Sequence, residues 1–329
     1  MYYSNISVKG EEDMKNIDLA WILVILLLAS FFMYYEDDIK DFVNNSFSIK
    51  ETSNNEITGN YYNESIVSYS ENKNTTEDSN DYITGSEYNF DEEYYIYYSH
   101  LSSEAKKIYK QVYANALTYN KTFKTVTKIT TNELSDVMES LFNDHPELFY
   151  LDTNYSYKYN SKGMCIEITL NYNDTINNIK YNKEIFDKEI NRIVAEANKL
   201  GNNYEKEKYV YMALINKVDY DKNANYNQSA YSAIIVGKSV CAGYARAFQL
   251  IMQKLNIPTY YVLGFAKEDH AWNIVKLSGE YYNIDLTWDD TGGVFKHFNL
   301  TDSEMAITHK REGISKKLPN CNYTTYRFE

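Results

Sequence analysis

Cysteine is scarce in this chain: Cys165, Cys241 and Cys321 are the only three among 329 residues. Such an odd and sparse set excludes a disulfide scaffold. At most Cys165 and Cys321 could form a disulfide, which would leave Cys241 free. The sequence also lacks a C-x-x-C pair and any Cys/His ligand spacing. We therefore predict no structural zinc, no other metal site and no cofactor.

The chain also lacks a basic segment. Its formal net charge is -13, and from Glu36 to Glu93 fifteen Asp and Glu face only three Lys. This stretch therefore accounts for twelve of the thirteen net negative charges, and the remainder is close to neutral. Because nothing supplies positive charge to offset phosphate, nucleic acid is not expected as a partner.

One long apolar run is present, LAWILVILLLASFFMYY at residues 19–35, and it contains no charge. At about 1.5 Å per residue a helix of this length just crosses a bilayer. Trp21 and the Tyr34-Tyr35 pair lie where interfacial aromatics are expected. We predict a transmembrane signal anchor at 17–35. The alternatives are a cleaved signal peptide, although no small-x-small site follows the run, and a buried core helix.

The charges around this run predict its orientation. Lys15 precedes it, and Glu36, Asp37 and Asp38 follow it. Residues 1–16 are therefore expected to form a cytoplasmic tail, with the bulk of the protein outside the cell.

The chain after the apolar run divides into three predicted parts. Residues 36–95 are acidic, polar and without sustained periodicity, which predicts a disordered tether. Residues 96–204 predict an α+β flank, and 205–329 a second domain. The expected flank contains a helix capped by Ser102 or Ser103, a helix between Asn132 and Pro146, strands at 147–151, 155–159 and 165–170, and a helix at 183–200. A helix at 206–218 opens the second domain.

Cys241 is predicted at the start of a helix. The turn Gly237-Lys238-Ser239 precedes it, an apolar stripe at helical spacing follows it, and Pro258 ends the segment. At a helix start, unpaired N–H groups and the helix dipole favour a thiolate and can stabilise an oxyanion. A lone cysteine is otherwise most often a small buried apolar residue.

A strand from His270 to Val275 and a returning strand from Tyr281 to Leu286 are predicted on either side of a two-residue turn, Ser278-Gly279. With that turn, Leu277 pairs with Glu280 and Asp285 lies opposite Trp272. His270 and Asp285 then share one face as diagonal neighbours. A loop one residue longer would place them on opposite faces.

A free cysteine, a histidine and an aspartate in this arrangement fit a nucleophile, a base and an orienting carboxylate. The segments GKSVCAGYARAF, HAWN and YNIDLTWDD, in this order, resemble the transglutaminase-like superfamily in its bacterial extracytoplasmic branch. The resemblance covers about residues 205–300 and extends more loosely to 102–106, 145–152 and 298–305.

The resemblance implies an α+β, papain-like fold in which the nucleophile helix packs on an antiparallel sheet. It also implies acyl transfer at a thiol, with Cys241 as nucleophile, His270 as base and Asp285 as third member. The family includes crosslinking enzymes, peptidases and deamidases, so the acceptor is an amine or water. The expected substrate is a protein or peptide amide at the cell surface or wall.

Further residues are weaker candidates. Tyr231 and Trp272 are alternatives for an oxyanion contact, each also readable as a core residue, and Asn273 is either a strand residue or a polar contact near the site. Structural roles are expected for Tyr244, Arg246, Asp289 and Asp290. Among the remaining histidines, His145 is expected at the surface or as a helix cap, while His297 and His309 can lie near the site.

Two other functional hypotheses fit the same sequence. In one, the domain is a non-catalytic cell-surface binding module with the same fold. In the other, the domain is a cytoplasmic enzyme with a membrane tail.

Overall fold

The computed structural model describes residues 57–59 and 83–328. The predicted signal anchor at 17–35 and the predicted cytoplasmic tail lie outside these residues, as does most of the predicted tether. Among the helices of the described ranges, none combines the length and apolarity that crossing a bilayer requires.

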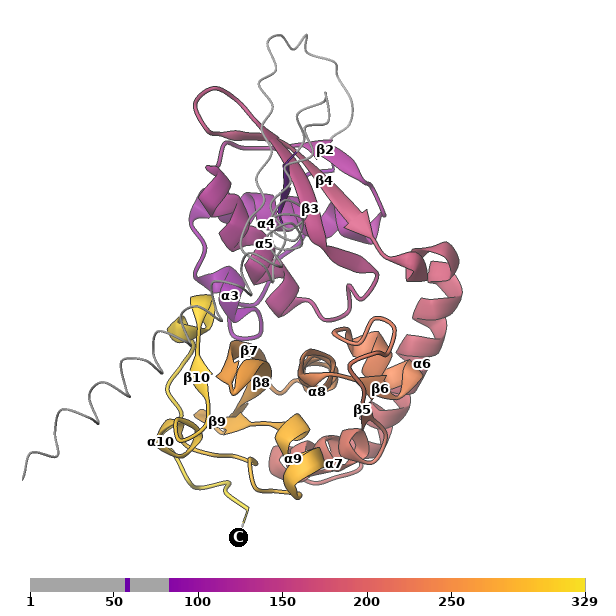
Figure 1. The fold of residues 1–329 in the computed structure, drawn as a ribbon, viewed down its shortest axis with the longest axis vertical. Helices are drawn as coiled ribbons and strands as arrows, with labels where there is room; N and C mark the ends of the chain where they lie inside the picture. The colour runs from indigo at the N-terminus through magenta and orange to yellow at the C-terminus, as the bar shows by residue number, and fades with distance from the viewer. Residues whose placement is uncertain (1–56, 60–82, 329) are drawn as a thin grey trace, which may run out of the picture. The chain divides into compact units, whose positions relative to one another are not determined.

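The N-terminal region comprises residues 57–59 and 83–172, and it lies in the upper part of Figure 1 in indigo to magenta. Its antiparallel sheet has the strand order β1-β3-β4-β2, and its helices α4 and α5 pack against each other. The elements are α3 (Ile96–Ser99), α4 (Ser103–Leu117), α5 (Thr131–Asp144), β1 (Ile57–Gly59), β2 (Thr122–Lys124), β3 (Leu151–Tyr159) and β4 (Cys165–Tyr172).

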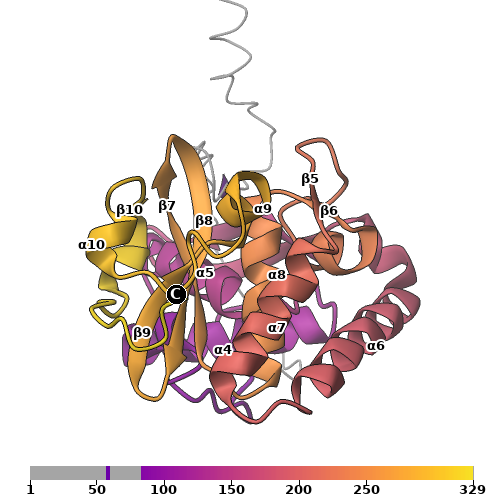
Figure 2. The same cartoon turned by 90° about the horizontal axis from the view of Figure 1, so that it is seen from below.

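The C-terminal region comprises residues 174–328 and contains a second antiparallel sheet, of order β10-β7-β8-β9. Helix α8 lies between this sheet on one side and α6 and α7 on the other (Figure 2). The elements are η1 (Asp174–Asn178), α6 (Ile179–Ala197), α7 (Asn203–Ile215), β5 (Asp219–Tyr220), η2 (Ser232–Val236), β6 (Lys238–Ser239), α8 (Cys241–Lys254), β7 (Thr259–Ala266), β8 (Glu268–Leu277), β9 (Glu280–Ile284), α9 (Leu286–Gly292), α10 (Asp302–Met305), β10 (Lys310–Arg311) and η3 (Gly313–Lys317).

The predicted α+β class and the packing of the Cys241 helix on an antiparallel sheet are both confirmed. Helix α8 is buried along almost its whole length, from Ala242 to Met252. Because the helix is covered, its buried polar residues Arg246 and Gln249 need hydrogen-bond partners. The first residue of the helix is Cys241, as predicted.

Gly243 allows the first turn of α8 to pack closely against the loop of residues 227–229. A Cβ atom at this position would lie 2.8 Å from the Asn227 carbonyl oxygen and 2.9 Å from that of Ser229. Backbone atoms cannot yield to such a contact, so only glycine allows this close packing. The beginning of α8 is thereby fixed to residues 227–229.

The two regions share one continuous hydrophobic cluster, which runs from Phe90 to Phe298. Polar contacts cross the same boundary: Arg246 donates to the Phe142 carbonyl (2.9 Å) and Gln249 to the Asn143 carbonyl (2.8 Å). The α+β flank therefore supports α8 directly.

Four expectations need correction. The apolar run 147–151 was expected as a strand, but it forms successive turns, with Leu148 and Leu151 donating to the carbonyls of His145 and Leu148. Its side chains are nevertheless buried, and an apolar run alone does not distinguish a strand from a buried turn. His145 caps α5, but its side chain is fully buried and not at the surface.

The tether expected at 36–95 also contains packed segments. Residues 57–59 pair with β3, and Phe90 is buried in the main cluster. The returning strand expected to reach Leu286 ends at Ile284, because the next residue, Asp285, caps α9 with its side chain.

Glu207 on α7 is a buried carboxyl with few hydrogen bonds to offset the cost of burying it. Its Oε2 atom accepts a hydrogen bond from the Asn299 amide (2.9 Å), and within the described residues its Oε1 atom has no partner. Burial raises the pKa of Glu207 to about 8. Because the folded state holds this proton more tightly than the unfolded chain, Glu207 reduces stability as pH rises from about 4.5 towards 8.

We expect Glu207→Gln to stabilise the protein at high pH and to have little effect at low pH. The gain in unfolding free energy between about pH 5 and pH 9 should be on the order of 3 kcal/mol. Chemical unfolding of both proteins across this range measures it. Glu205→Gln is the control, because Glu205 lies on the same helix with its side chain 45% exposed. A gain that does not change with pH would contradict the explanation.

Candidate active site

Cys241 lies at an open helix N-terminus. No side chain among the described residues caps α8, whose N-cap is Val240, and the Val240 N–H is used by the Asn227 carbonyl (3.1 Å). The N–H groups of Cys241 and Ala242 lie in the first turn, where the helix itself provides no carbonyl for them to bond with. They are therefore available to a negatively charged oxygen beside the half-buried Cys241 side chain.

The β8–β9 hairpin has the predicted register. Leu277 pairs with Glu280 and Asn273 with Ile284, around a two-residue turn. Both turn residues, Ser278 and Gly279, have positive φ (51° and 88°), as the tightest hairpin turns require. This register places His270 on β8 within reach of the residue that follows β9.

Asp285 is that residue, and its two carboxylate oxygens have separate functions. Oδ1 accepts the backbone N–H groups of Thr287 (2.9 Å) and Trp288 (3.2 Å), which caps α9. Oδ2 lies 2.7 Å from His270 Nε2. The helix cap thus holds the carboxylate in the orientation that the imidazole needs.

The His270 imidazole lies between Asp285 and Cys241. Burial alone would lower the pKa of His270, but the Asp285 carboxylate, and after it the neighbouring Cys241 side chain, raise it to about 10. Since Nε2 is used by Asp285, Nδ1 is the nitrogen left for the sulfur. Burial would raise the pKa of Asp285, but His270 and His309 hold it well below its usual range.

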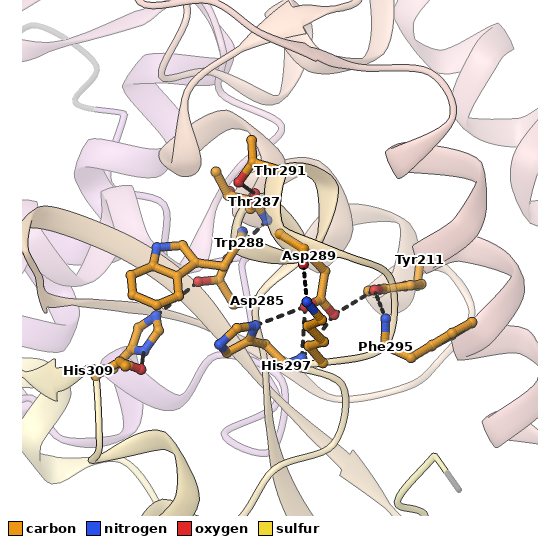
Figure 3. A network of polar contacts seen from close by, with 12 residues as sticks. Tyr211, Asp285, Thr287, Trp288, Asp289, Thr291, Phe295, His297 and His309 are labelled. Carbon is orange, nitrogen blue, oxygen red and sulfur yellow. Dashed lines mark hydrogen bonds and ion pairs between the residues drawn. The ribbon is translucent and has the colours of Figure 1, made fainter.

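Two further histidines lie close to this group. His309 is buried, and its Nε2 lies 3.0 Å from the same Asp285 oxygen that His270 contacts (Figure 3). His297 instead pairs with Asp289, one turn further along α9, with Nδ1 2.9 Å from the carboxylate. Asp289 also accepts the Tyr211 hydroxyl (2.6 Å), so this second group braces α9 from α7.

His270, Asp285 and His309 form a group with metal-ligand chemistry. One ligand atom from each lies within 4.8 Å of the others, and all three residues are buried. Both imidazole Nε2 atoms, however, are directed at Asp285 Oδ2 as hydrogen-bond partners. A metal ion there would have to displace these hydrogen bonds.

The weaker candidates have structural contacts. The Tyr231 hydroxyl donates to Asn182 (3.1 Å), and its ring stacks on Phe149. Trp272 is buried and donates its indole N–H to Asn283 (3.2 Å). Asn273 donates to the carbonyls of Ala245 (3.0 Å) and Tyr260 (3.2 Å), which ties α8 to the sheet.

Tyr220 lies near Cys241, which the sequence analysis did not anticipate. Strand β5 pairs in parallel with β6, so Tyr220 lies beside Ser239, two residues before Cys241. Burial, and after it the charge of Cys241, raise the pKa of the Tyr220 hydroxyl. The Tyr220 phenol is therefore within electrostatic range of the thiol. The signal was weak, because the two strands have only two residues each.

The larger of two described cavities, of about 360 Å³, contains none of the triad residues. One wall is the loop of residues 226–229, which packs on α8 at Gly243, and Arg246 from α8 also lines it. On a helix with about 3.6 residues per turn, Arg246 lies on a different side from Cys241, and none of Cys241, His270 and Asp285 lines the cavity.

Comparison with known families places this geometry in a class. Residues 191–286 match the family model of the Transglutaminase-like superfamily. The matched segment is less than a third of the chain, and Cys241, His270 and Asp285 all lie within it, whereas His309 lies beyond it. No curated protein matches the chain.

Among solved structures, a candidate cysteine protease from Cytophaga hutchinsonii is similar over 38% of this chain and 51% of its own, with 21% identity and a TM-score of 0.29. A structure described as a TGase is similar over 53% of this chain and 50% of its own, with 16% identity and a TM-score of 0.30. The chain thus spans about half the length of either structure.

The three cysteines should differ sharply in reactivity. All three are free thiols, but Cys165 and Cys321 are fully buried, and burial raises the pKa of Cys165 to about 12. Burial also raises the pKa of Cys321. We therefore expect iodoacetamide to alkylate native protein at Cys241 alone, since only a thiolate reacts.

Peptide mapping by mass spectrometry measures the labelled position. Cys241→Ser should abolish the rapid alkylation by iodoacetamide, and Cys165→Ser should leave it unchanged. Fast labelling of Cys165 or Cys321 in the folded protein would contradict the assigned burial.

Proposed function

We propose that the protein is a thiol-dependent acyl-transfer enzyme that acts on protein or peptide amides. The observation that carries this proposal is the Asp285–His270 contact of 2.7 Å, on an imidazole whose pKa the neighbouring Cys241 side chain also raises. The match to the transglutaminase-like superfamily supports the same reaction class.

In the first half-reaction His270 Nδ1 takes the Cys241 thiol proton, and the sulfur attacks the amide carbonyl carbon. The carbonyl π electrons move to oxygen and form a tetrahedral oxyanion. As the oxyanion collapses, the C–N bond breaks, and His270 donates the proton to the leaving amine. The products are a thioester on Cys241 and free ammonia or an amine.

In the second half-reaction an acceptor, either water or a primary amine, attacks the thioester carbonyl. His270 removes a proton from the acceptor, the C–S bond breaks, and the proton returns to sulfur. Water gives hydrolysis, whereas a lysine amine gives a crosslink. Asp285 keeps the imidazole oriented and stabilises its charged form in both halves.

The oxyanion has two sources of stabilisation in this proposal. One is the open first turn of α8, whose N–H groups and dipole favour negative charge. The other is the Tyr220 hydroxyl, which takes the role that the sequence suggested for Tyr231 or Trp272. The contacts of those two residues commit their polar atoms elsewhere.

For location, we propose a single-pass membrane protein whose catalytic domain lies outside the cytoplasm, anchored through residues 19–35. The uncharged run and the flanking charges of the sequence support this. A C-terminal tag should be accessible on intact cells. Accessibility only after permeabilisation would indicate the cytoplasmic alternative.

Removing the imidazole or its carboxylate partner should severely impair acylation. For His270→Ala we expect a loss of about 10³-fold or more in the rate of thioester formation. Asp285→Asn should also be severely impaired, because the amide cannot stabilise the imidazolium. For both variants, the rate is measured from the burst of product that an activated ester releases when it acylates the enzyme. Intact-mass spectrometry detects the acyl-enzyme.

His100→Ala is the matched control, because His100 is exposed and lies outside the site. Product analysis with a glutamine peptide and a lysine donor then separates the outcomes. Loss of ammonia with joined chains indicates transfer, and new carboxylates indicate hydrolysis. Binding of a polymer or protein that survives Cys241→Ala, without any burst, would favour the binding-module alternative.

Tyr220→Phe should slow acylation with little effect on substrate binding. Loss of one donor to the oxyanion costs about 10²-fold in kcat, because it acts on the transition state. Steady-state kinetics that separate kcat from KM measure the effect. Tyr231→Phe is the matched control and should behave as wild type. The reverse pattern would return the role to Tyr231.

A further inference from the structure

His309 comes from a segment beyond the family match, and that segment is fastened to the sheet. We call residues 301–321 the C-terminal strap. Within it, Lys310 and Arg311 pair with Phe265 and Gly264 of β7. Arg311 forms an ion pair with Asp302, and Asp302 also accepts the Cys321 backbone N–H (2.9 Å). These contacts define where the His309 side chain lies.

The surroundings of His309 fix its protonation and its tautomer. Its Nδ1 atom lies 2.7 Å from the Thr308 hydroxyl, and Nε2 lies 3.0 Å from Asp285 Oδ2. Burial lowers the pKa of His309, although Asp285 opposes this. In the neutral form that results, the Thr308 hydroxyl donates to Nδ1, and Nε2–H donates to the carboxylate.

Aromatic rings enclose this imidazole. The Trp288 ring centroid lies 4.5 Å from that of His309, the Trp272 centroid 5.2 Å and the His270 centroid 5.3 Å. His309 is 5% exposed, so bulk water does not compete for its hydrogen bond. In such a site a hydrogen bond to a charged oxygen is stronger than in water.

We propose that His309 is a positioning residue that acts on His270 through the shared oxygen of Asp285. Two donors meet at Oδ2, one from each imidazole. The His309 donor withdraws part of the negative charge that would otherwise stabilise the His270 imidazolium. It therefore leaves His270 able to release its proton to the leaving amine, and it fixes the plane of the carboxylate. This inference rests on the proposed acyl transfer.

Other groups also face this cluster and influence its titration. They are Cys241 from α8, Tyr211 from α7, Tyr220 from β5, Lys267 from the β7–β8 turn, Asp289 from α9 and His297 from the loop that follows it. None of them is altered in the variants of His309 or Thr308 below. A shift in the pH profile of those variants thus reports the change at Asp285.

The test measures Cys241 alkylation and ester acylation against pH in the full chain. His309→Leu removes the donor, and the upper limb of the pH profile, where His270 loses its proton, should move up by about 0.5 unit or more. Acylation at neutral pH should fall about tenfold, as expected when one hydrogen bond to a charged group is lost. His309→Gln retains a donor at the position of Nε2 and should return both values to near wild type.

His297→Gln is the matched control, because it alters the neighbouring His–Asp pair without touching Asp285 Oδ2. The upper limb of the pH profile of His297→Gln should stay at its wild-type position. If His309→Leu does not fold, Thr308→Val gives the answer from an exposed position. Without the hydroxyl, Nδ1–H becomes available as the alternative tautomer, so the limb should shift in the same direction by a smaller amount.

An unshifted profile in His309→Leu or in Thr308→Val, with only a lower melting temperature, would overturn the inference and leave His309 as a packing residue. The proposed function fails separately, since alkylation can be read without turnover. If His270→Ala and Asp285→Asn also leave the alkylation profile unchanged, the triad itself is wrong. If they change it and the His309 and Thr308 variants do not, only the role of His309 is lost.

Discussion

A buried carboxylate is the point on which the site depends. Asp285 is 1% exposed and would be costly to bury without partners, because a charge in the interior must be compensated by hydrogen bonds. Its four contacts come from two backbone N–H groups and two imidazoles. They join the start of α9, strand β8 and the C-terminal strap at one residue. The folding of these three elements and the orientation of the base are thus coupled.

The position of Cys241 depends on a different kind of constraint, which is steric. Helix α8 is pressed against residues 227–229 at Gly243, and Asn273 ties its other side to β7 and β8. The N-terminal region adds contacts further along the same helix, through the backbone of α5. A buried helix held on all sides cannot shift without disturbing the core. The distance between sulfur and imidazole is therefore set by packing.

The sequence was sufficient where the determinants are local. The turn Ser278-Gly279 dictates the hairpin register, and the glycine turn followed by an apolar stripe marks the start of α8. Both signals lie within a few residues of the feature that they specify. The position of Asp285 was less well predicted, although Asp followed by a short helix is itself a capping signal.

The missed features depend on contacts between distant segments. Tyr220 reaches the thiol through a parallel pair of two-residue strands, and His309 reaches Asp285 through a two-residue bridge to β7. Pairings this short have no periodicity from which to predict them. The turns at 147–150 were misread for a related reason, because burial of apolar side chains does not by itself specify an extended backbone.

The C-terminal strap is the last part of this site to be synthesised. During synthesis, α8, β8 and Asp285 all leave the ribosome before His309 does. Until the strap docks on β7, one donor to Asp285 is missing and the aromatic enclosure is incomplete. Because a domain generally folds as a unit, the surroundings of Asp285 are complete only once this last-made segment has joined the fold.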